Sequence, residues 1–132
     1  MESPGKQTIL VVEDDPLVQS MIVRILQKMD FQVLHADDGD SALEICEDRD
    51  WTIHLLMTDV LMPGMTGIQL AETVRTKAPH VKILFLSGYM DGVEPSGIRL
   101  EEMGGFLQKP ASREELLGKI YELLGSSEEE FY

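Results

Sequence analysis

Short apolar runs alternate with longer amphipathic stretches along the chain. The runs are rich in branched side chains, as buried strands are, and they fall at residues 9–12, 31–36, 53–57, 82–86 and 106–108. After the first run, apolar residues from Val18 to Met29 recur at i, i+3, i+4 and i+7, which predicts a helix with one buried face. Strand ends near residues 12, 36, 58, 87 and 108 therefore mark five βα units.

The strands are apolar throughout rather than alternating, and this favours a parallel sheet covered by helices on both faces. We therefore expect an α/β fold with a doubly wound parallel sheet. It forms one domain over residues 7–124, with flexible ends at 1–6 and 125–132.

Two helix starts carry a capping-box pattern, in Thr66 with Gln69 and in Ser112 with Glu115. The segment 88–97 is different, because it holds three glycines and a proline and few apolar residues. We expect the fourth helix to be short and late there, at about residues 96–103.

The composition limits the classes of molecule that the chain is expected to bind. The chain has 24 Asp and Glu against 11 Lys and Arg, a net charge of −13, which argues against direct nucleic-acid binding and against an anionic membrane surface. No apolar run approaches the roughly 18 residues of a spanning helix, so we expect no membrane insertion. The single cysteine, Cys46, forms no internal disulfide, which is typical of a cytoplasmic protein.

Candidate chemistry lies at the strand ends, where parallel sheets gather their functional groups. Glu13 and Asp14 follow the first strand, Asp59 the third, Ser87 the fourth and Lys109 the fifth. Carboxylates this close repel one another by about 4 kcal/mol per pair at an effective dielectric near 20, so a divalent ion would stabilise them. Mg²⁺ prefers such hard oxygen ligands. A lysine and a hydroxyl beside them would suit a phosphoryl group carried on Asp59.

The same motifs resemble the receiver domain of two-component response regulators. The resemblance covers residues 7–124 and implies a flavodoxin-like (βα)5 sheet in the order 2-1-3-4-5 with five helices. The matching segments are Ile9–Pro16 (ILVVEDDP), Thr58–Met65 (TDVLMPGM), Phe85–Gly88 (FLSG) and Phe106–Pro110 (FLQKP).

The resemblance implies a role for each matched residue. Asp59 corresponds to the phosphoacceptor, Glu13 and Asp14 to the acidic pair that binds Mg²⁺, and Leu61 to the residue whose backbone carbonyl completes the metal site. Asp14 is favoured as the direct ligand, since Glu13 stands where Asp is commoner and its contact with the metal could run through water.

Ser87, Lys109 and Phe106 correspond to the residues that bind the phosphoryl group and switch the domain. Ala111 departs from the pattern, because an aromatic residue often follows the Lys-Pro pair.

The implied function is a phosphorylation switch and not an enzyme in the wider sense. A histidine kinase or a histidine phosphotransfer protein would donate the phosphoryl group, and slow autodephosphorylation would remove it. A downstream effector would bind the face formed by the fourth helix, fifth strand and last helix, and a phosphorylation-linked dimer is compatible with the family. The amino-acid sequence of the motifs also resembles that of receivers attached to hybrid histidine kinases.

The same residues disfavour two other functions. An FMN carrier is disfavoured because the acidic run at 13–15 would repel phosphate, and an aspartate phosphatase because Leu61 stands where a second Asp is needed. A phosphorylation-independent docking module stays open. So does the role of Asp15, either at the start of the first helix or as a further metal contact.

Overall fold

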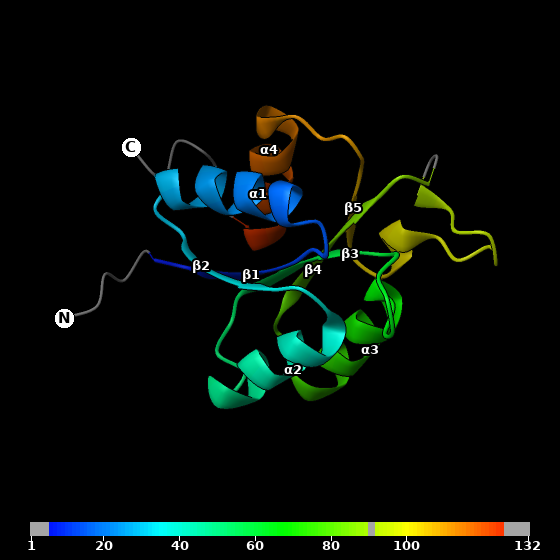
Figure 1. The fold of residues 1–132 in the computed structure, drawn as a ribbon, viewed down its shortest axis with the longest axis horizontal. Helices are drawn as coiled ribbons and strands as arrows, with labels where there is room; N and C mark the ends of the chain where they lie inside the picture. The colour runs from blue at the N-terminus through cyan, green and yellow to red at the C-terminus, as the bar shows by residue number, and fades with distance from the viewer. Residues whose placement is uncertain (1–5, 90–91, 126–132) are drawn as a thin grey trace.

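The computed structural model describes residues 6–89 and 92–125, which form a five-stranded parallel sheet (Figure 1). The strand order β2-β1-β3-β4-β5 confirms the expected topology. The expected flexible ends lie outside the described residues, apart from Lys6 and Gly125. The strands are β1 (Thr8–Val12), β2 (Gln32–Ala36), β3 (Leu55–Asp59), β4 (Lys82–Ser87) and β5 (Gly105–Gln108).

Helices cover both faces of the sheet, as the uniformly apolar strands require. Figure 1 shows α1 (Pro16–Lys28) and α4 (Arg113–Leu124) on one face and α2 (Gly39–Asp48) and α3 (Gly67–Lys77) on the other. Side chains alternate between the faces, so that Ile9 belongs to the core under α1 and α4, whereas Leu10 belongs to the core under α2 and α3. None of the helices in the described ranges is long and apolar enough to cross a membrane.

The helix starts follow the local sequence. The capping boxes expected at Thr66 and at Ser112 are both present, before α3 and α4 respectively. Asp15 is the N-cap of α1, where its carboxylate accepts the backbone N–H groups of Leu17 and Val18. The side chain of Asp15 therefore serves the helix start, whereas a contact with a metal ion stays a prediction.

The connection between β4 and β5 corrects the expectation of five helices. Its described residues include the 3₁₀ turn η2 (Leu100–Glu102) but no α-helix, so the described part of the fold has four α-helices. Gly92 and Gly97 have positive φ angles of 69° and 96°, which a regular helix excludes. A short antiparallel bridge between Val93 and Arg99 uses the backbone groups that a longer helix would have needed. In place of a fourth α-helix, η2 precedes β5 and α4.

Candidate functional site

Strand register brings the strand-end residues together. Val12 of β1 pairs with Thr58 of β3, so Glu13 and Asp59 lie on neighbouring strands at the same edge of the sheet. Asp59 in turn pairs with Leu86 of β4, which puts Ser87 one residue beyond it.

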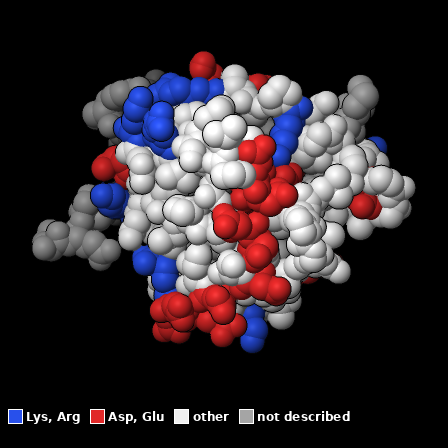
Figure 2. Space-filling model, viewed as in Figure 1, with Lys and Arg blue, Asp and Glu red and all other residues white. Residues whose placement is uncertain are grey.

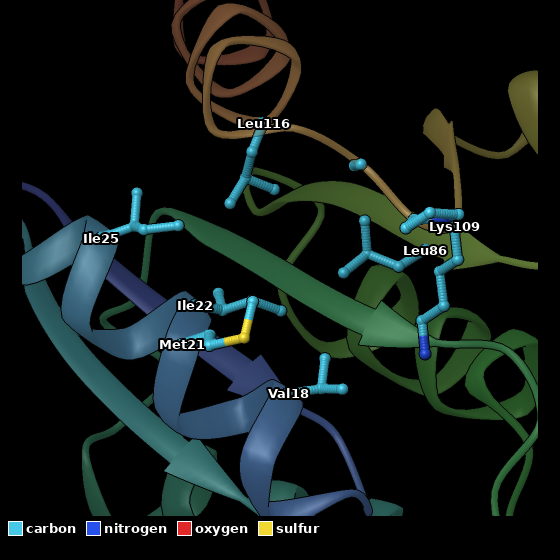
Figure 3. A pocket seen from close by; sticks show the side chains of 9 residues that line it. Val18, Met21, Ile22, Ile25, Leu86, Lys109 and Leu116 are labelled. Atoms are coloured by element: carbon cyan, nitrogen blue, oxygen red, sulfur yellow. The ribbon is translucent and has the colours of Figure 1, made fainter.

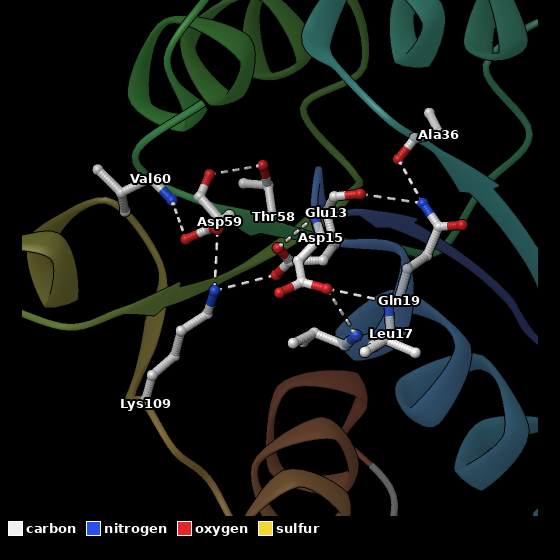
Figure 4. A network of polar contacts seen from close by, with 10 residues as sticks. Glu13, Asp15, Leu17, Gln19, Ala36, Thr58, Asp59, Val60 and Lys109 are labelled. Atoms are coloured by element: carbon white, nitrogen blue, oxygen red, sulfur yellow. Dashed lines mark hydrogen bonds and ion pairs between the residues drawn. The ribbon is translucent and has the colours of Figure 1, made fainter. Parts of the chain in front are cut away.

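Lys109 joins the two buried acids. Its Nζ lies 2.9 Å from Asp59 Oδ2 and 3.0 Å from Glu13 Oε2. Figure 4 shows Lys109 reaching toward both carboxylates. The lysine follows β5, and its backbone N–H donates to the Ser87 carbonyl over 2.7 Å. The Lys109–Pro110 peptide bond is cis. The cation therefore sits within hydrogen-bond reach of the two acids that end β1 and β3.

Asp59 is held from several sides. Its Oδ1 accepts the Val60 N–H at 3.0 Å, and its backbone carbonyl accepts the Thr58 hydroxyl at 2.9 Å. Gly67, the first residue of α3, packs against the Asp59 carbonyl so closely that a Cβ there would overlap it. With a residue exposure of only 8%, Asp59 presents its Oδ2 to Lys109 from a fixed backbone.

Burial and ion pairing shift the pKa values of the charged groups in opposite directions. Burial raises the pKa of Glu13, which is 2% exposed, while the hydrogen bonds from Lys109 and Asp15 lower it and the Asp59 charge raises it. For Lys109, burial alone lowers the pKa, but the hydrogen bonds to Asp59 and Glu13 outweigh it and the pKa is raised. The lysine thus stays protonated at neutral pH and offsets the crowded carboxylates.

The acidic residues also fit a divalent cation. Glu13, Asp14 and Asp59 each offer a carboxylate oxygen, and these oxygens lie within 4.8 Å of one another. Asp14 is exposed, whereas Glu13 is buried and hydrogen-bonded to Lys109. Hard oxygen ligands with open solvent on one side suit Mg²⁺, which keeps several of its waters.

The remaining predicted site residues, Ser87, Phe106 and Leu61, differ in burial. Ser87 is 3% exposed, and its Oγ accepts the Tyr89 N–H at 3.0 Å, which leaves its own hydroxyl hydrogen free to donate. Phe106 is half-buried, and its ring lies directly against Gly92. Leu61 has a 63% exposed side chain, and the role of its backbone carbonyl stays a prediction.

Sequence reasoning missed three residues that shape the site. Thr58 and Gly67 fix the backbone of Asp59, and Gln19 of α1 donates to the Glu13 carbonyl. The sequence marks Gln19 in one way only, because it is a polar residue on the apolar, buried face of a predicted helix. No pattern in one sequence marks the close approach of Gly67.

An apolar pocket opens beside Lys109. It has a volume of about 180 Å³ and lies between α1 and α4 (Figure 3). Met21, which lines the pocket, is 63% exposed, and Leu17, one turn earlier in α1, is 78% exposed. The residues lining it are Val18, Met21, Ile22, Ile25, Leu86, Lys109, Pro110, Ala111 and Leu116.

Exposed acids continue from the site across one face of the molecule. Figure 2 shows Asp and Glu side chains in a band through the middle of this face. Asp14 and Asp15 are exposed after β1, and Asp37 and Asp40 are exposed around the start of α2. Such a band attracts cations and disfavours polyanions.

Comparisons with known proteins agree with this geometry. The profile of the family described as "Response regulator receiver domain" matches residues 9–121. Sensor kinase CckA of Brucella abortus is 35% identical over 91% of this chain and 13% of its own length. The response regulator receiver protein CpdR of the same organism is 32% identical over 88% of this chain and 95% of its own length.

Solved structures give the same family of folds. The receiver domain of the hybrid histidine kinase CckA has a TM-score of 0.75 at 35% identity, covering 89% of this chain and 98% of that one. A receiver domain protein from Clostridium thermocellum has a TM-score of 0.80 at 24% identity, covering 90% and 94% of the two chains, and supports the fold. The chain spans 13% of CckA and 47% of another relative, the Bacillus subtilis regulatory protein YrkP.

Proposed function

Since the chain belongs to the response regulator receiver domain family, we propose that Asp59 accepts a phosphoryl group from a phosphohistidine in a Mg²⁺-dependent reaction. The observation that carries the proposal is the Lys109 ammonium group, which contacts Asp59 Oδ2 and Glu13 Oε2 together. The chain thereby acts as a signalling module, expected in the cytoplasm, that promotes its own phosphorylation and slow dephosphorylation.

The transfer is a displacement at phosphorus. A carboxylate oxygen of Asp59 forms the new P–O bond while the P–N bond to the donor histidine breaks, and the imidazole leaves carrying the bond's electron pair, which then takes up a proton. Attack by a carboxylate oxygen requires no general base, unlike attack by a hydroxyl or a thiol. The product is an acyl phosphate whose added charge lies beside Lys109 and the Ser87 hydroxyl.

Glu13, Asp14, Asp59 and the Leu61 carbonyl are the groups that would hold Mg²⁺. When bound, the ion neutralises charge on the phosphoryl oxygens. Lys109 supplies a second cation on the side of β5, and Ser87 donates a hydrogen bond to a phosphoryl oxygen.

The apolar surface beside the site favours a protein donor over a small molecule. Leu17 and Met21 project from α1 next to the pocket that Lys109 borders, so a helix of the donor can bury them while its phosphohistidine reaches Asp59. A Met21→Lys variant should accept phosphoryl groups from a small phosphodonor at the wild-type rate, but more slowly from a panel of autophosphorylated histidine kinases. Ile98→Lys, in the β4–β5 connection, is the control.

The phosphorylation signal would reach a partner through the surface formed by η2, β5 and α4. Phosphorylation would draw the Ser87 hydroxyl toward the phosphoryl group and change the setting of Phe106, shifting an existing equilibrium that an effector or a second copy of the chain reads. Because relatives such as CckA are much longer than this chain, their activities and partners could belong to other domains.

Intact mass after incubation with acetyl phosphate, with and without Mg²⁺, tests the proposal. We expect one added phosphoryl group that requires Mg²⁺ and is absent in Asp59→Asn. A folded wild-type chain that gains no mass would instead support the phosphorylation-independent docking module.

A further inference from the structure

Gln19 is the one glutamine of α1 that is buried, and it lies at the junction of β1 and β2. Its side chain is on the sheet side of the helix, and the residue is 8% exposed. The amide nitrogen lies 3.0 Å from the Glu13 carbonyl oxygen and 3.0 Å from the Ala36 carbonyl oxygen (Figure 4). It also lies 3.1 Å from Asp37 Oδ1. Two amide hydrogens are therefore shared among three oxygen acceptors.

These acceptors lie where the two strands part. The ladder between β1 and β2 ends at the pair Val12 and Ala36, and Glu13 still donates its N–H to the Ala36 carbonyl at 3.2 Å. The Glu13 carbonyl lies beyond the ladder, and a buried carbonyl without a partner would be costly. Gln19 supplies the hydrogen bond that the next residue of a longer β2 would have made.

The hydrogen bond has a consequence for the candidate metal site. The Glu13 carbonyl belongs to the same rigid peptide unit as the backbone N–H of Asp14. Fixing that carbonyl limits the rotation of the peptide, and so sets the direction in which the exposed Asp14 side chain leaves the backbone. Glu13, on the other side of the carbonyl, is constrained by the same contact.

We propose that Gln19 is a positioning residue for the divalent-cation site, acting through the Glu13–Asp14 peptide. The proposal rests on the Mg²⁺ site of the proposed function. Partners that orient metal ligands are commonly worth about 10- to 100-fold in metal affinity. A purely structural role would lower the stability of the fold without changing the affinity of the folded protein for Mg²⁺.

The test measures Mg²⁺ binding by calorimetry in the wild type, Gln19→Leu and Gln27→Leu. Leucine keeps the apolar bulk of Gln19 but donates no hydrogen bond, and Gln27 is an exposed glutamine of the same helix. We expect about tenfold weaker binding for Gln19→Leu and an unchanged affinity for Gln27→Leu. At saturating Mg²⁺ the phosphorylation rate of Gln19→Leu should return to that of the wild type.

Equal affinities in wild type and folded Gln19→Leu overturn the positioning role while leaving the proposed function intact. A wild type that binds no Mg²⁺ overturns both. Should Gln19→Leu fail to fold, NMR of the wild type decides instead. The Gln19 side-chain amide protons should exchange slowly with solvent and shift as Mg²⁺ is added, unlike those of Gln27. Fast exchange without a shift would refute the proposal.

Discussion

Gly67 offers the sharpest test of how the backbone holds Asp59. It is the first residue of α3 and is buried, and a Cβ built on it would lie 2.9 Å from the Asp59 carbonyl carbon and 3.0 Å from Val60 Cα. The Asp59 carbonyl oxygen would be closer still. These atoms are backbone, so a Gly67→Ala substitution must push α3 away from the end of β3.

The magnitude follows from two opposing effects. Alanine gains up to about 1 kcal/mol over glycine within a helix. Forcing a methyl group into packed backbone costs about 3 kcal/mol. We therefore expect Gly67→Ala to lower the free energy of unfolding by about 2 kcal/mol, and to slow the phosphorylation of Asp59, whose carbonyl moves with the shift.

Gly118→Ala is the matched control. Gly118 lies within α4, is exposed, and a Cβ there would meet nothing within 4 Å. This substitution should raise the free energy of unfolding by about 0.5–1 kcal/mol and leave phosphorylation unchanged. Urea unfolding followed by circular dichroism measures both variants. If Gly67→Ala matched the wild type in stability, the close approach of α3 to Asp59 would be wrong.

Four further substitutions test separate parts of the structure. Asp15→Ala should cost about 1 kcal/mol of stability by loss of the helix cap while the Mg²⁺ affinity stays unchanged. Asp14→Ala should weaken Mg²⁺ binding and leave the stability unchanged. A loss of Mg²⁺ affinity in Asp15→Ala would contradict a role of Asp15 confined to the helix cap. Lys109→Ala leaves Glu13 and Asp59 unpaired, so thermal unfolding at pH 7 should occur at a lower temperature and Mg²⁺ should stabilise this variant more than the wild type. It should still accept some phosphoryl groups, yet fail to switch partner binding. Burial raises the pKa of Cys46 to about 11. The thiol stays protonated to a higher pH in the folded state than in the unfolded state. Its contribution to the free energy of unfolding is therefore complete below pH 9 and is lost as the pH rises through 11. The stability advantage of the wild type over Cys46→Ala should accordingly shrink by up to about 2.7 kcal/mol across that range; a constant difference would show that the thiol titrates normally.

The sheet and the residues at its edge could be predicted because both depend on local pattern. Apolar runs marked all five strands, and the end of β3 fell at Asp59, one residue beyond the expected position. Parallel strands end at one edge, so Glu13, Asp59 and Lys109 had to meet there once the strand order was right. The capping boxes at Thr66 and Ser112 formed because their spacing satisfies the helix-end N–H groups locally.

The features that escaped prediction depend on long-range contacts. The segment before β5 was recognised as irregular, but the helix expected at 96–103 shrank to η2 because the turn around Gly97 ends in a bridge to Val93. The hydrogen bonds of Gln19 depend on where β2 stops relative to β1. The approach of Gly67 to Asp59 depends on the entry angle of α3. None of these long-range contacts produces a periodic pattern in the sequence.

The identity of the phosphorylated residue is the most direct test of the central claim. Borohydride reduces an acyl phosphate of aspartate to homoserine, which peptide mass spectrometry locates in the chain. After phosphorylation with Mg²⁺ and reduction, we expect homoserine at position 59 alone, with Asp14 unmodified. Homoserine at position 14, or a stable phosphoryl group that resists reduction, would contradict Asp59 as the phosphoacceptor.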